Sequence, residues 1–165
     1  MDMISAEVLR RARQRRRQLS EVQERVLREA FHLIRAGRVA TAVALEARTS
    51  LSSAEVHAAL DSLQAEGRIV HEADGGVVGA FGLSLLPTLH HLVLDGRQLF
   101  AWCALDATGI PVGLAMDATV RSQCCTCQQG LTIVYRAGIV TQALPTVLCL
   151  WVAKPEVGQS VVGDT

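Results

Sequence analysis

Hydrophobic residues in the first part of the chain recur every three or four positions, which is the spacing of amphipathic helices. Two capping boxes, beginning at Ser20 and Ser52, open such stretches, and Gly37 and Gly67 follow them. A short alanine-rich stretch lies between the two. The pattern therefore predicts helices over residues 4–18, 21–36, 41–47 and 53–66.

After residue 67 the hydrophobic pattern changes to short runs typical of strands. Asp74-Gly75-Gly76 and Asp95-Gly96 each lie between two such runs and predict hairpin turns. The predicted strands cover residues 68–72, 77–81, 89–94, 98–102, 112–116, 119–122, 131–135 and 147–153.

This order of elements predicts an α+β protein with two parts. Three helices followed by a two-stranded hairpin are typical of a winged-helix arrangement, here over about residues 20–82. We expect a winged-helix-like N-terminal domain over residues 1–81. A small mixed, mainly antiparallel β domain with a short helix should follow over residues 82–165.

Charge along the chain bears on whether the front part binds nucleic acid. Six arginines between residues 10 and 17 favour such binding, but the chain as a whole has no net charge. The helix at 53–66 would be the recognition helix, and no Lys or Arg lies between residues 54 and 65. Because phosphate contacts need cations, this argues against a nucleic-acid partner and favours a structural module, with DNA binding and protein docking as alternatives. The residues predicted to face outward on the helix at 53–66 are Glu55, His57, Asp61 and Gln64.

Composition narrows the class of protein further. No apolar run resembles a signal peptide or is long enough to span a membrane, so we expect a cytoplasmic protein without a membrane partner. In that compartment five cysteines are expected to be reduced, metal-binding or catalytic. The chain has no nucleophile elbow, no phosphate-binding glycine loop and no His-Glu metalloprotease motif, which argues against a serine hydrolase, a nucleotide-binding protein and a zincin.

Cys103 and Asp106 lie one helical turn apart, directly after a predicted strand. If Cys103 begins a short helix, the helix dipole should lower the pKa of its thiol, whereas the carboxylate of Asp106 should oppose ionisation. A bound metal cation, or a proton carried by Asp106, would reconcile the two effects. The alternative is a buried structural cysteine beside an aspartate that caps a turn.

A second thiol cluster surrounds Cys124 and Cys127, which have the spacing of a metal knuckle or redox pair, with Cys125 between them. A structural zinc site needs four ligands, and the chain has no second such pair. Cys149 lies in an apolar run and is predicted to be part of the core. His90 and His91 should point to opposite faces of a strand and so cannot chelate together.

Several stretches together resemble the alkylmercury (organomercurial) lyases, and the sharpest is Trp102-Cys103-Ala104-Leu105-Asp106. The other matching stretches are Gly82-Leu83-Ser84-Leu85, Pro87-Thr88, Asp95-Gly96-Arg97, Leu99-Phe100-Ala101, Thr119-Val120-Arg121-Ser122-Gln123-Cys124, Pro145 and Pro155. The resemblance implies protonolysis of a carbon–mercury bond without a separate cofactor. In that reaction Cys103 would be the mercury-binding thiolate and Asp106 the group that passes a proton to the leaving carbon.

The same resemblance implies partners and shows one departure. Its partners would be a small organomercurial or other soft electrophile, and low-molecular-weight thiols or a mercury-accepting reductase. The family uses a second mercury-binding cysteine further along, but residues 154–165 contain none, as if the catalytic core were shortened at its C-terminus. Cys124 matches a family cysteine of structural character. Either the chain lacks the family's C-terminal element, or another thiol substitutes, for which Cys125 and Cys127 are the candidates.

Two other functions compete with a lyase. The first is a non-catalytic protein that binds soft metals through Cys103 and the thiols of residues 124–127. The second is a winged-helix transcriptional regulator whose back half senses an effector.

Overall fold

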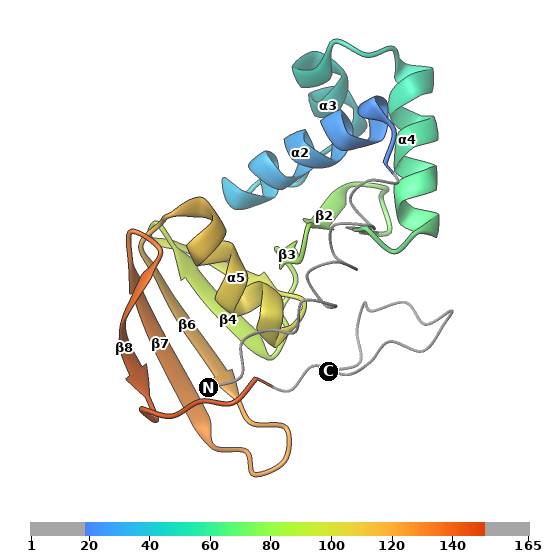
Figure 1. Cartoon of the computed structure of the whole chain (residues 1–165). Helices are drawn as coiled ribbons and strands as arrows, with labels where there is room; N and C mark the ends of the chain where they lie inside the picture. The colour runs from blue at the N-terminus through green and yellow to red at the C-terminus, as the bar shows by residue number, and fades with distance from the viewer. Residues whose placement is uncertain (1–18, 151–165) are drawn as a thin grey trace.

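The computed structural model describes residues 19–150, which form four helices and eight strands (Figure 1). The predicted helix at 4–18 and the last three residues of the predicted strand at 147–153 lie outside this range. The helices are α2 (Glu21–Arg35), α3 (Ala42–Thr49), α4 (Ser53–Ala65) and α5 (Ala104–Leu114). The strands are β1 (Ile69–His71), β2 (Val77–Ala80), β3 (Leu83–Ser84), β4 (His90–Leu94), β5 (Arg97–Ala101), β6 (Ala118–Gln123), β7 (Gly130–Arg136) and β8 (Ile139–Leu144).

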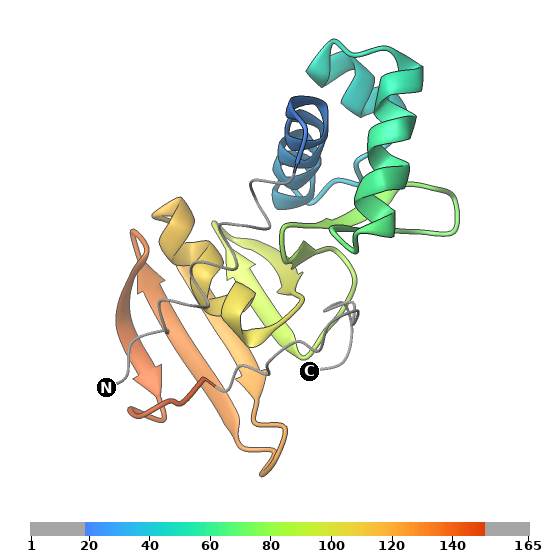
Figure 2. The same ribbon diagram turned by 45° about the vertical axis from the view of Figure 1, so that its right-hand side comes forward.

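All eight strands belong to one antiparallel sheet in the order β1-β2-β3-β5-β4-β6-β7-β8. Helices α2, α3 and α4 gather at the β1–β2 end, and α5 lies across one face of the strands at the other end (Figures 1 and 2). The predicted α+β class is confirmed. No described helix is both long and apolar enough to cross a membrane.

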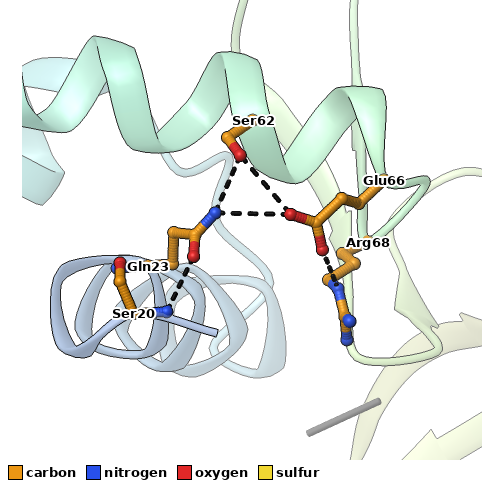
Figure 3. Close-up of polar contacts among 5 residues, drawn as sticks. All are labelled: Ser20, Gln23, Ser62, Glu66 and Arg68. Carbon is orange, nitrogen blue, oxygen red and sulfur yellow. Dashed lines mark hydrogen bonds and ion pairs between the residues drawn. The ribbon is translucent and has the colours of Figure 1, made fainter. Parts of the chain in front are cut away.

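Both predicted capping boxes are present and fix where α2 and α4 begin. Gln23 accepts the backbone N–H of Ser20 at 2.8 Å and donates its own amide to Ser62 Oγ on α4, also at 2.8 Å (Figure 3). Glu66 accepts a longer bond from the same amide, at 3.4 Å, and pairs with Arg68 at 2.6 Å. One side chain thus both caps α2 and ties it to α4.

Two strand predictions in the back half are wrong. Residues 112–116 include the end of α5, and residues 147–150 form no strand. Helix α5 continues through Pro111 because its packing against β4, β5 and β6 buries Ala107 and Pro111, which overrides weak local propensity. The edge of the sheet at this end is instead β8, an exposed strand that follows the tight turn at Ala137 and Gly138.

The two halves of the chain share one core. The cluster of buried apolar residues extends from α2 and α4 through the sheet to β7. Phe31 of α2 meets Phe81 edge-on, with ring centroids 6.0 Å apart. Phe81 and Gly82 form the tight turn between β2 and β3, so the predicted domain boundary falls in a hairpin turn.

Candidate functional site

Cys103 is the N-cap residue of α5, so the predicted short helix after this strand is confirmed. Strand β5 ends at Ala101, Cys103 keeps an extended backbone, and Asp106 follows on the first turn of the helix. The Cys103 thiol donates a hydrogen bond to Asp106 Oδ2 at 3.0 Å. The predicted pair therefore forms, with both side chains half-buried.

The predicted lowering of the Cys103 pKa is wrong. Burial, then the negative charge of Asp106 and the hydrogen bond to it, raise the pKa of Cys103 to about 11. The backbone N–H groups of Asp106 and Leu105 act in the opposite direction but do not offset these effects. The free protein therefore holds Cys103 as a thiol.

Burial also raises the pKa of Asp106, although hydrogen bonds from the thiol and backbone N–H of Cys103 counteract it. Both groups thus disfavour their charged forms, and the thiol proton of Cys103 lies on the hydrogen bond to the Asp106 oxygen. If a thiophilic cation binds the sulfur, the thiol proton can move to the carboxylate without a rearrangement.

Gly82 packs against the carboxyl group of the Cys103–Asp106 pair. Its φ is +82°, and a Cβ built on it would overlap the Asp106 carboxyl group, which therefore lies directly over its α-carbon. The Gly82 carbonyl accepts the backbone N–H of Trp102 at 2.8 Å. Gly82 was not predicted to belong to the site, because nothing in the sequence near this glycine indicates that residue 106 lies against it.

Trp102 lies against a second glycine. A Cβ on Gly79 of β2 would be 3.0 Å from Trp102 Nε1 and 3.2 Å from Cζ2, so the bare strand admits the indole ring. Trp102 Nε1 is buried and has no hydrogen-bond partner among the described residues. Trp102, the residue before Cys103, is thus held by its backbone hydrogen bond to Gly82 and by the packing of its ring on Gly79.

The histidines of β4 alternate as predicted. His90 is buried and shares a 2.7 Å hydrogen bond with Ser122, and burial lowers the pKa of His90. His91 points to the other face, where its ring lies 5.3 Å from that of Phe100.

The other four cysteines do not belong to a group of three metal ligands among the described residues. All five cysteines are free thiols. Cys124 and Cys127 meet in the turn between β6 and β7, whereas Cys149 is exposed, so its predicted place in the core is wrong because residues 147–150 lie on the surface. Within residues 19–150, no three His, Cys, Asp or Glu side chains are grouped so as to hold a metal ion.

The fold and the site define an α+β protein with a protonated thiol paired with a carboxyl group at the start of a helix. The family model for alkylmercury lyase (MerB) matches residues 83–164. The chain is 33% identical over 99 residues to an alkylmercury lyase of Bacillus cereus and 28% identical over 134 residues to one of Streptomyces lividans. Over residues 83–164 the chain is thus similar to the alkylmercury lyases.

A solved structure supports the same assignment. The crystal structure of the mercury-bound form of MerB2 superposes with a TM-score of 0.75 and 32% sequence identity, covering 78% of this chain and 63% of that one. The match to the Bacillus cereus protein covers 60% of this chain but only 44% of that protein, and the Streptomyces lividans match covers 81% and 60%. This chain thus spans about half the length of the curated relatives it matches.

Proposed function

We propose that the protein cleaves the carbon–mercury bond of a small organomercurial at Cys103 and Asp106. The observation that carries this proposal is the 3.0 Å hydrogen bond from the Cys103 thiol to Asp106. It joins a soft ligand for mercury to a group that can take its proton and return it. The similarity to alkylmercury lyases over residues 83–164 supports the same chemistry.

The first step exchanges a proton for mercury on sulfur. An organomercurial R–Hg–X binds Cys103, the thiol proton moves to Asp106, and X leaves as an anion, which gives Cys103–S–Hg–R and a carboxylic acid. The raised pKa of Asp106 makes that acid an effective donor.

The second step breaks the carbon–mercury bond. A thiolate from solution binds the mercury and donates electron density, and Asp106 passes its proton to the carbon. The hydrocarbon R–H leaves, mercury stays between two sulfurs, and Asp106 is again a carboxylate. We propose that low-molecular-weight thiols supply the second sulfur, that a mercury-accepting reductase takes the product, and that no resident cofactor takes part. Because the thiols must stay reduced, the reaction belongs in the cytoplasm.

The helical front half is proposed to be a winged-helix-like structural module rather than a DNA reader. Glu55, His57, Asp61 and Gln64 of α4 are exposed, as predicted, and this helix contains no Lys or Arg. At the end of α4, Ser62 accepts a hydrogen bond from Gln23 of α2, and Glu66 forms an ion pair with Arg68. The turn that contacts Asp106 directly follows β2, the last strand of this module, so the module is connected to the site through it.

Benzene release from phenylmercuric acetate in excess monothiol tests the lyase. Wild-type protein is expected to release benzene catalytically, Cys103→Ser to release none, and Asp106→Asn to be slower by about a hundredfold, within the range of general-acid catalysis. The matched control is Asp117→Asn, which removes a surface carboxylate that binds Arg136. Gas chromatography measures the benzene.

Two outcomes would contradict the lyase proposal. Stoichiometric retention of mercury without benzene would make the protein a soft-metal binder. Benzene release that Asp106→Asn and Asp117→Asn reduce equally would remove Asp106 from the reaction.

A further inference from the structure

Three thiols lie within four residues at an exposed turn that the proposed lyase reaction does not use. Cys124 is half-buried, and Cys125 and Cys127 are exposed, in the connection between β6 and β7. This turn extends beyond the sheet at the end away from α2, α3 and α4 (Figure 1).

The turn is held in one shape by its own backbone. Cys124 N–H donates to Gln129 O, and Gln128 N–H donates to Cys124 O, both at 2.9 Å. Gln128 takes a positive φ of 58°, and its side-chain amide reaches Cys125 O at 3.3 Å. Two backbone bonds thus close the loop directly above the last strand pair, Gln123 with Gly130.

Within this loop, hydrogen-bond donors converge on one sulfur. The backbone N–H groups of Cys127 and Thr126 and the thiol of Cys127 face Cys124 Sγ and lower the pKa of Cys124. Donors of this kind orient a sulfur ligand and stabilise it once it is bound to a metal. The Cys125 sulfur instead lies 3.9 Å from the hydroxyl of Thr126.

We propose that Cys124 and Cys127 form a two-sulfur site for a soft, thiophilic cation such as mercuric ion, separate from Cys103 and Asp106. Binding replaces two thiol protons by two metal–sulfur bonds and releases both protons. Two sulfurs suffice for a soft cation that accepts two ligands, whereas zinc prefers four. No third ligand is grouped with these two sulfurs among the described residues. The site should therefore prefer soft cations that accept two sulfur ligands over zinc.

The site does not depend on carbon–mercury cleavage. It stands on the geometry of the turn and would bind mercuric ion from any source. Were Cys103 to release mercuric ion, this turn would offer it two sulfurs on the same molecule.

Mercuric chloride is the probe that tests the site, in a full-length Cys103→Ser, Cys149→Ser background that leaves only the three thiols of the turn. This reduced protein is expected to keep one mercuric ion per chain. Because the two sulfurs act as a chelate, Cys124→Ser or Cys127→Ser should let about a hundredfold less competing monothiol remove the ion. Cys125→Ser is the matched control and should keep it. Native mass spectrometry counts the bound metal, and circular dichroism shows that each variant is folded.

Each other result overturns the proposal. Equal loss in Cys125→Ser and Cys124→Ser would mean independent single thiols, and removal from the background protein as easily as from Cys124→Ser would mean no chelate. Zinc retained as strongly as mercuric ion would mean that further ligands complete a different site. Since the background lacks Cys103, failure here leaves the lyase proposal untouched, and the benzene assay can fail without affecting this site.

Discussion

Gly82 has no side chain, and this lets the Asp106 carboxyl group pack directly against its backbone. Gly82 offers a bare α-carbon at a backbone angle that other residues rarely adopt, and the carboxyl group occupies the space where a Cβ would be. From that position Asp106 accepts the Cys103 thiol at 3.0 Å. At the residue scale the site is therefore a triad of thiol, carboxyl group and glycine.

Replacing Gly82 by alanine should displace the carboxyl group. Misplacement of a catalytic group by about 1 Å can cost a hundredfold in rate, and we expect about that loss of benzene release. The positive φ should also destabilise the fold by about 1–3 kcal/mol. Activity and the free energy of unfolding, measured on the same preparation, separate the two effects.

Gly96→Ala is the matched control for that substitution. Gly96 has a similar positive φ of 77°, but a Cβ there would meet no atom within 4 Å. It should lose stability while keeping its activity. Equal loss of activity in both variants would show that Gly82 serves only the backbone.

The Asp106 charge should also be visible in the titration of Cys103. In the wild type, the alkylation rate of Cys103 should rise about tenfold per pH unit up to the thiol pKa of about 11. Asp106→Asn removes the negative charge and should lower that pKa, so alkylation at neutral pH becomes faster. Mass spectrometry after iodoacetamide treatment measures the rate at this cysteine, and an unchanged profile would leave burial as the sole cause.

At the scale of elements, the sequence identified those helices and strands whose ends are marked by particular residues. The capping boxes at Ser20 and Ser52 and the turns at Gly75 and Gly96 lie where they were predicted. Helix α5 was predicted too short because its packing on the sheet, not its local propensity, carries it through Pro111. Strand β8 was missed because it is an exposed edge strand without a hydrophobic pattern.

Gln23 is the clearest test at this scale, because it joins two helices through one amide. Gln23→Ala removes the bond to the Ser20 backbone and the bond to Ser62, and should lower the free energy of unfolding by about 1–2 kcal/mol. The nearby surface variant Glu24→Ala should change it by less than about 0.5 kcal/mol. Urea denaturation gives both values, and an equal effect would mean that the amide adds nothing to the α2–α4 contact.

At the scale of the whole molecule, long-range pairing is what the sequence could not predict. The spacing of Cys103 and Asp106 indicated their contact because residues three positions apart on a helix lie on the same face. The raised pKa of the thiol depends on burial by distant elements, and the Gly82 contact spans two parts of the chain. The sheet order likewise places β3 beside β5 and β4 beside β6, which no turn signal specifies.

That shared sheet predicts how the molecule unfolds. The helices α2, α3 and α4 and the strands β4 to β7 belong to one buried cluster, connected through the β2–β3 turn and the Phe31–Phe81 contact. We expect one cooperative transition in urea. Far-ultraviolet circular dichroism should coincide with the fluorescence of Trp102, isolated in a Trp151→Phe variant. Phe31→Leu, which removes the ring pair, should shift both curves together by about 0.5–1.5 kcal/mol. Separated transitions, with only the helical signal shifted, would mean that the front half folds on its own and that the turn under Asp106 is held from one side only.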